Sequence, residues 1–360
     1  MATHTSILVG TAKGLFVVSG DGRQRWEVSG PFLRGQALYA VAWERSHDRP
    51  RILAGGHSEH WGPSVVWSDD LGATWDERDG GSVRFPPDVD AAVRRIWQLH
   101  PADDGVVWAG VEPAALFRSA DRGVSFELVR GLWEHPHRPQ WTPGGGGLCL
   151  HTVLLDPSTP ERLWVAISTG GVYRSDDGGV TWQARNRGIA TPFLPGDEPP
   201  EFGQCVHKMA LHPAVPDRLF LQHHWGVYRS DDGGDGWNSV GRALPSDFGF
   251  PLVVHPDDPD TVFVIPLESD EFRVTPEGRC RVYRSSDGGG SWSALTDGLP
   301  QRDAYLTVLR DAFAASVQPV GLFFGTRTGE LFGSVDGGER WSTLVRHLPP
   351  VLSVRPLAMD

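Results

Sequence analysis

Two short stretches of the chain carry the same pair of residue types that bind metals and move protons. WTPGGGGLCLHT, residues 141–152, contains Cys149 and His151, and GQCVHKMALHP, residues 203–213, contains Cys205 and His207 in the same spacing. Thiolate and imidazole groups are common ligands of transition metals, and imidazole is the commonest general acid or base. If the fold brings the two stretches together, they predict a metal site or an acid–base site.

A metal site needs further ligands, and the chain offers them. The predicted metal ligands are His151, His207, His223, His224 and Glu112, with Glu268 as the alternative carboxylate. Such a set suits Zn, Mn, Fe or Ni. The alternative is that these histidines satisfy buried backbone groups, as core histidines usually do, and that their spacing is only that of a repeat.

The same residues also allow chemistry without a metal. A histidine or Tyr305 could serve as general base and acid, while Arg95 or Arg273 binds a substrate carboxylate through two hydrogen bonds. The catalytic candidates are His151, His207, Arg95, Glu112, Glu268 and Tyr305. We therefore expect a hydrolase or lyase that acts on a small polar, anionic or sugar-like substrate.

An internal repeat indicates the elements that position these residues. Octets of the form Ser-x-Asp-x-Gly-x-x-Trp occur seven times, the first with Arg23 in place of Gly and the third with Phe in place of Trp. They begin at Ser19, Ser68, Ser119, Ser175, Ser230, Ser285 and Ser334. Asp and Gly suit a tight turn between strands, so we expect the octets to be structural and not catalytic.

Each repeat has room for about four short strands with their turns, which is the content of one propeller blade. The sequence therefore predicts an all-β, seven-bladed β-propeller formed by residues 1–360 as a single domain. SILVGT near the start resembles a second strand of a blade, and LPPVLSVRPL near the end resembles a first strand. We expect the C-terminal strand to complete the N-terminal blade.

The octet resembles the Asp box, or BNR repeat, and the whole chain resembles the bacterial Asp-box propellers. Sialidases, xyloglucan-cleaving hydrolases, sortilin-type receptors and photosystem II assembly factors have similar repeats. GVEPA, PGGGGLCLH, GQCVHK, LPSDFGF and PLESDEFRVTP are similar to signatures of a bacterial subfamily described as sialidase-like or glycosyl-hydrolase-like. The resemblance implies the fold and leaves the reaction open.

Two glycosidase hypotheses differ in how well the residues fit. A sialidase needs clustered arginines and an Arg-Ile-Pro-type motif in the first blade, and FRVTP at Phe272 does not match it. Other glycoside hydrolases need only two carboxyl groups at a suitable separation. Glu112, Glu268, Asp270 and Asp247 could supply them.

Other hypotheses place function in the connections between strands, where propellers gather their binding loops. The tryptophans expected there could bind sugar rings or pack between blades; they are Trp61, Trp97, Trp133, Trp141 and Trp225. Gly144–Gly147 could let the backbone pass close to a ligand or could act as a hinge. The last alternative is a non-catalytic scaffold that binds proteins on its broad face.

Composition narrows the partners. A net charge of −12 and the lack of a basic cluster argue against nucleic acid. No stretch is apolar enough for a membrane helix, and the N-terminus does not resemble a signal peptide. Three cysteines are too few and odd in number for a disulfide framework, so we expect a cytoplasmic protein. The expected partner is a small-molecule substrate.

Overall fold

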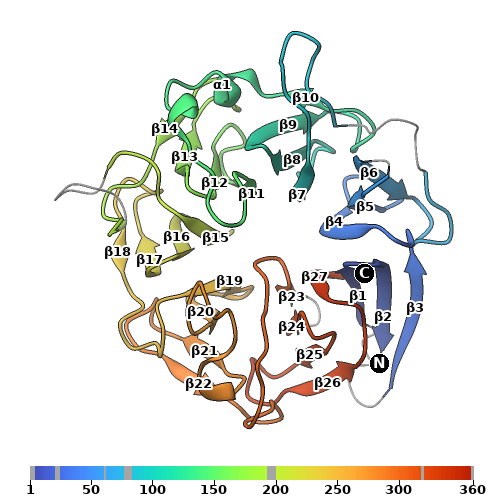
Figure 1. The fold of residues 1–360 in the computed structure, drawn as a ribbon, viewed down its shortest axis with the longest axis vertical. Coiled ribbons are helices and arrows are strands. Elements are labelled where there is room, and N and C mark those ends of the chain that lie inside the picture. Colours follow the sequence, from blue (N-terminus) through green and yellow to red (C-terminus); the bar gives the residue numbers. More distant parts are fainter. Residues whose placement is uncertain are drawn as a thin grey trace. The chain divides into compact units, whose positions relative to one another are not determined.

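The computed structural model describes residues 5–20, 25–60, 62–76, 83–192, 200–317 and 320–357. These residues form seven antiparallel sheets, six with four strands and one with three, and the strands follow the chain order in every sheet except the N-terminal one. Each sheet corresponds to one repeat of the sequence (Figure 1). The prediction of an all-β, seven-bladed β-propeller is confirmed.

The chain divides into two compact units: Unit I comprises residues 1–34, 188–190 and 207–360, and Unit II comprises residues 35–187 and 191–206. Unit II contains three sheets, and its strands are β4 (Ala37–Glu44), β5 (Arg51–Ser58), β6 (Gly62–Ser68), β7 (Arg95–Pro101), β8 (Val107–Glu112), β9 (Ala115–Ser119), β10 (Glu127–Leu128), β11 (Leu150–Leu155), β12 (Leu163–Ile167), β13 (Gly171–Ser175) and β14 (Gln183–Ala184). Its long connection after β10 includes two short helices, α1 (Arg130–Trp133) and η1 (Arg138–Gln140).

Unit I contains four sheets and all but the first residue of β15. Its strands are β1 (Thr5–Thr11), β2 (Gly14–Gly20), β3 (Trp26–Phe32), β15 (Val206–His212), β16 (Val215–His223), β17 (Gly226–Ser230), β18 (Asn238–Ser239), β19 (Gly249–His255), β20 (Asp258–Pro266), β21 (Val282–Ser285), β22 (Ser293–Leu295), β23 (Phe313–Val317), β24 (Val320–Gly325), β25 (Leu331–Ser334), β26 (Ser342–Val345) and β27 (Val351–Leu357). One short helix, η2 (Pro276–Gly278), precedes β21. Within the described ranges, no helix is long and apolar enough to span a membrane.

The C-terminal strand completes the N-terminal sheet, as the sequence predicts. The order of that sheet is β27-β1-β2-β3, and Val9 of β1 pairs with Val354 of β27. Figure 1 shows β27, in red, beside β1, in blue. The backbone N–H of Ala12 also donates to the carbonyl of Pro350 at 2.9 Å. The two ends of the chain are thus joined by a full strand ladder.

The octets form the turn between the third and fourth strands of a blade. In the copy at Ser175, the serine hydroxyl donates to Asp177 at 2.8 Å and accepts from the N–H of Gly179 at 2.8 Å. The Asp177 carboxylate also accepts from the N–H of Thr181, and Trp182 donates to Gly179. The Ser-to-Asp bond recurs at Ser68, Ser119, Ser230, Ser285 and Ser334. The copy at Ser19 includes residues 21–24, which lie outside the described residues.

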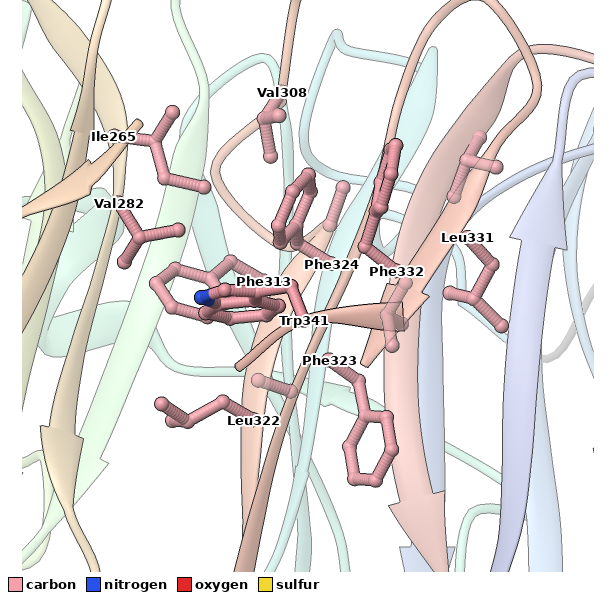
Figure 2. Packing of buried hydrophobic residues seen from close by; sticks show 14 of the residues in the cluster. Ile265, Val282, Val308, Phe313, Leu322, Phe323, Phe324, Leu331, Phe332 and Trp341 are labelled. Carbon is pink, nitrogen blue, oxygen red and sulfur yellow. The ribbon is translucent and has the colours of Figure 1, made fainter. Parts of the chain in front are cut away.

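The octet tryptophan ends a blade by entering the apolar core. Trp341 is 2% exposed and its ring lies 5.1 Å from that of Phe324, in a cluster with Phe313 and Phe332 (Figure 2). The strands that carry these rings, β23, β24 and β25, are mostly buried and contain several phenylalanines, which suits a pleated surface packed against its neighbours. Packing between the sheets of Unit I therefore holds the ends of the connections between their strands in place.

Candidate functional site

Unit II brings together the predicted anion-binding arginine, a predicted carboxylate and two aromatic rings. Arg95 begins β7 and Glu112 ends β8, and the two residues are direct cross-strand partners. The Arg95 Nη1 lies 3.6 Å from Glu112 Oε2, to which the Trp97 indole N–H also donates at 3.3 Å. The Tyr39 ring lies 5.0 Å from the Trp97 ring, and the Arg95 guanidinium covers both. We call these four residues the Glu112 cluster.

The glycine run of the first stretch lies against this cluster. A Cβ on Gly147 would stand 2.6 Å from Glu112 Oε1, and Gly147 has a φ of +91°. The N–H of Gly147 donates to the carbonyl of Gly144 at 3.0 Å, which closes a turn. Gly146 has no heavy atom within 4 Å of such a Cβ. The structure therefore favours the close-approach explanation for Gly147, because its φ suits glycine and an added Cβ would force the Glu112 carboxylate to shift.

His151 of β11 has both ring nitrogens occupied. Its Nε2 donates to the carbonyl of Val206 at 2.9 Å, and its Nδ1 accepts from the hydroxyl of Thr152 at 3.0 Å. The side chain is fully buried. This arrangement is that of a core histidine that satisfies buried polar groups, the alternative that the sequence left open.

In Unit I, two other predicted ligands lie together at the start of a blade. His207, on β15, and His224, just after β16, have ring centroids 5.4 Å apart. Phe248 and Phe250 pack on His207 at centroid distances of 5.2 Å and 4.8 Å. The carbonyl of Gly249 lies 2.6 Å from His207 Nδ1. Because a carbonyl only accepts, Nδ1 carries the proton and Nε2 keeps its lone pair. We call His207, His224, Phe248 and Phe250 the His207 cluster.

Charged groups surround the His207 cluster. His224 Nε2 lies 3.4 Å from a carboxylate oxygen of Asp270. The guanidinium carbons of Arg273 and Arg310 lie 5.5 Å and 5.7 Å from the centre of the Phe250 ring. Burial, and secondly the charge of Arg310, hold the pKa of His207 well below its ordinary value. Burial also lowers the pKa of His224, against the opposing effect of Asp270. Both imidazoles are therefore neutral at pH 7.

His223 differs from its neighbour His224. It is fully buried, and its Nδ1 accepts from the backbone N–H of Trp225 at 3.2 Å. Its Nε2 therefore carries the proton, and this buried atom has no hydrogen-bond partner among the described residues. Burial lowers the pKa of His223 to about 3. His223 can donate a hydrogen bond but cannot offer Nε2 as a ligand in this tautomer.

The remaining catalytic candidates, Glu268 and Tyr305, are exposed. Glu268 follows β20, and its carbonyl accepts from the hydroxyl of Ser246. Tyr305 is 56% exposed and packs against Gly278. Tyr305 lies in the irregular segment before β23, the first strand of its blade, which begins at Phe313.

A separate cavity of about 510 Å³ opens beside β25 and β26 in Unit I. The side chains that could bind a ligand there are Arg302, Asp303, Glu330 and Arg346. None of the predicted catalytic or metal residues lines it. Sequence reasoning also missed Phe248 and Arg310, which have roles only through their contacts with His207 and Phe250. Phe248 lies within LPSDFGF, a stretch similar to a subfamily signature that does not itself indicate a contact with His207, and Arg310 belongs to no such stretch.

Comparison with known proteins supports the repeat assignment. A model of the BNR/Asp-box repeat matches residues 173–184. The chain carries BNR/Asp-box repeats. A xyloglucanase from Hypocrea jecorina is 28% identical over 293 residues, which covers 71% of this chain and 32% of that protein. The chain thus spans about a third of the length of this relative.

Solved structures show the same fold at low identity. The GH74 xyloglucanase from Xanthomonas campestris superposes with a TM-score of 0.64 and 17% identity, covering 95% of this chain and 52% of that one. YCF48 from Cyanidioschyzon merolae superposes with a TM-score of 0.59 and 14% identity, covering 88% of each chain. At these identities the likeness concerns the propeller fold alone.

Proposed function

We propose that the protein is a hydrolase that cleaves a sugar-like substrate at the Glu112 cluster. The observation that carries this proposal is the Glu112 carboxylate, which is held by Trp97 and Arg95 and lies against the Gly147 backbone. Its side chain is 15% exposed, so it is largely shielded and still open to a ligand. The sequence similarity to xyloglucanases adds support for a polysaccharide or oligosaccharide substrate.

The residues of the Glu112 cluster have different roles in binding a sugar. Tyr39 and Trp97 supply apolar ring surface, against which the C–H groups of a sugar pack. Arg95 supplies N–H donors for hydroxyl or carboxylate oxygens. Glu112 acts as one of the two carboxyl groups that glycoside hydrolysis requires.

The test is release of new reducing ends from xyloglucan, its oligosaccharides and other glucans. We expect the wild-type protein to cleave at least one of them and the Glu112→Gln variant to be slower by about 100-fold or more, since a positioned acid or base contributes at least that factor. Glu134→Gln is the matched control, because Glu134 is an exposed partner of Arg130 outside the cluster. Its rate should equal that of the wild type.

Two results would contradict the proposal. Equal rates for the wild type and Glu112→Gln would remove Glu112 from catalysis. Absence of any cleavage by the wild type across the panel would contradict the hydrolase proposal and would favour the scaffold hypothesis. The next experiment would then be to identify proteins that bind both the wild type and Glu112→Gln.

A further inference from the structure

The cavity beside β25 and β26 in Unit I combines an apolar lining with four charged side chains. Its volume of about 510 Å³ is in the range of small-molecule sites. Phe332 of β25 contributes to the lining and stacks on Phe324 at a ring-centroid distance of 4.9 Å (Figure 2). The other buried apolar residues of the lining are Leu299, Ala304 and Leu306. The cavity can therefore hold the apolar part of a small ligand.

Hydrogen bonds hold the irregular segment between β22 and β23 that forms one side of the cavity. The N–H of Ala304 donates to the carbonyl of Gly278 at 2.9 Å, and the N–H of Cys280 donates to the carbonyl of Pro300 at 2.9 Å. The side-chain amide of Gln301 donates to the carbonyl of Cys280 at 2.6 Å. This side of the cavity is thus tied to the rest of Unit I, which suits a preformed binding site.

Glu330, directly before β25, supplies a fixed negative charge to the lining. The hydroxyls of Thr326 and Thr328 both donate to its Oε2 at 2.6 Å. Burial acts to raise the pKa of Glu330, but hydrogen bonds, chiefly from these hydroxyls, and the charge of Arg346 outweigh it, so the pKa is lowered. A carboxylate has about four acceptor positions, so Glu330 can accept further hydrogen bonds from a ligand. Asp303 adds a second carboxylate to the lining.

Two guanidinium groups, those of Arg302 and Arg346, line the same cavity. Leu331 of β25 pairs with Val345 of β26. Glu330 and Arg346 therefore adjoin the same end of this strand pair. Within the described ranges, no ion pair joins Arg302 or Arg346 to a carboxylate. Because a guanidinium presents its N–H donors in a fork that matches a carboxylate, both arginines are available to an acidic group of a ligand.

We propose that this cavity binds a small zwitterion with an apolar side chain, of the class of an α-amino acid or a dipeptide. The two arginines bind its carboxylate, Glu330 and Asp303 accept from its ammonium group, and the buried apolar residues contact its side chain. Two charges of each sign favour a ligand that carries both signs over a simple anion or cation. This site goes beyond the proposed sugar hydrolysis, because no residue of the Glu112 cluster lines the cavity.

Isothermal titration calorimetry of the full chain with L-leucine and with leucyl-leucine tests the site. We expect at least one of the two to saturate at one equivalent. Its C-terminal amide lacks the carboxylate, and its N-acetyl form lacks the ammonium group. Each blocked form should bind about tenfold more weakly or worse, as for loss of a hydrogen bond between charged groups.

Two variants and a control assign the binding to the cavity. Arg346→Gln and Glu330→Gln should each bind the zwitterion about tenfold more weakly or worse, because each removes one charge from the lining. Arg327→Gln is the matched control, since Arg327 is an exposed arginine between β24 and β25 that does not line the cavity, and it should bind like the wild type. Melting temperatures check that each variant is folded; if Glu330→Gln is not, the exposed Arg346 carries the test.

Three results would overturn the proposal. They are absence of saturable binding of both probes, equal affinity for a probe and both of its blocked forms, and wild-type affinity in Arg346→Gln. No readout involves turnover, so failure of the hydrolase proposal is a separate result.

Discussion

At the scale of single residues, similar sequence signals have different structural outcomes. Cys149-x-His151 and Cys205-x-His207 are the same pattern. His151 donates to the carbonyl of Val206 and accepts from Thr152, whereas His207 donates from Nδ1 to the carbonyl of Gly249. The pattern fixes the position of each histidine on its strand, but the partner of each nitrogen comes from another blade or a neighbouring residue. The sequence could therefore propose both histidines as site residues but could not distinguish between them.

Gly147 provides a sharp test at this scale. Gly147→Ala puts a methyl group 2.6 Å from Glu112 Oε1 and places alanine at a φ of +91°. We expect a loss of stability of about 1–3 kcal/mol from the strained backbone, together with loss of activity as Glu112 is displaced. Chemical denaturation and the reducing-end assay measure the two effects.

Gly146→Ala is the matched control, because its added methyl group meets no atom within 4 Å and its φ is not positive. It should leave stability and activity close to those of the wild type. If both alanine variants behaved alike, the close approach of Gly147 to Glu112 would not matter for activity. That result would support the explanation that the glycine run acts as a hinge.

At the scale of elements, the octets were predictable in detail because their chemistry is local. Ser, Asp, Gly and Trp within eight residues make their hydrogen bonds to one another, so the sequence alone contains the structure of the turn. The strands that follow irregular connections were harder. Tyr305, for example, lies in a segment before β23 that has no regular structure, and residue propensity could not reveal that.

The octets also predict a dependence of stability on pH. Hydrogen bonds from Thr74 lower the pKa of Asp70 to about 2, and a bond from Ser285 does the same for Asp287. Both folded-state values lie below the ordinary 3.8, so the ionised carboxylates stabilise the fold above that pH. This contribution is lost as the pH falls from 3.8 towards 2.

Melting temperatures measured across this range provide the test. We expect little change between about pH 7 and 5 and a marked fall below about pH 4. The Asp70→Asn/Asp287→Asn double variant should start from a lower melting temperature and fall less steeply. An equal fall in the wild type and the double variant would show that these carboxylates do not set the acid limit.

At the scale of the whole molecule, the repeat count predicted the fold, and the incomplete ends of the chain predicted its closure. β27 pairs with β1 along most of its length and fills the first position of the N-terminal sheet. What the repeats could not predict is which loops meet, because loop conformations depend on contacts that the repeat does not encode. The Glu112 and His207 clusters were accordingly visible only as scattered residue types.

Deletion of residues 349–360 tests the closure. Without β27, the backbone of β1 loses its ladder partners, and buried residues such as Val351 and Val354 no longer cover the core. We expect the melting temperature to fall sharply or the chain to become insoluble, because an open edge strand invites aggregation. An unchanged transition in differential scanning calorimetry would contradict the closing role.

The central claim is that a sugar binds at the Glu112 cluster, and a crystal structure of Glu112→Gln with a xyloglucan oligosaccharide tests it most directly. The account predicts a sugar ring in contact with Tyr39 or Trp97, with an oxygen of the ligand within hydrogen-bonding distance of residue 112. A sugar bound instead in the cavity beside β25 and β26, or a crystal soaked to saturation with no sugar at the cluster, would contradict it.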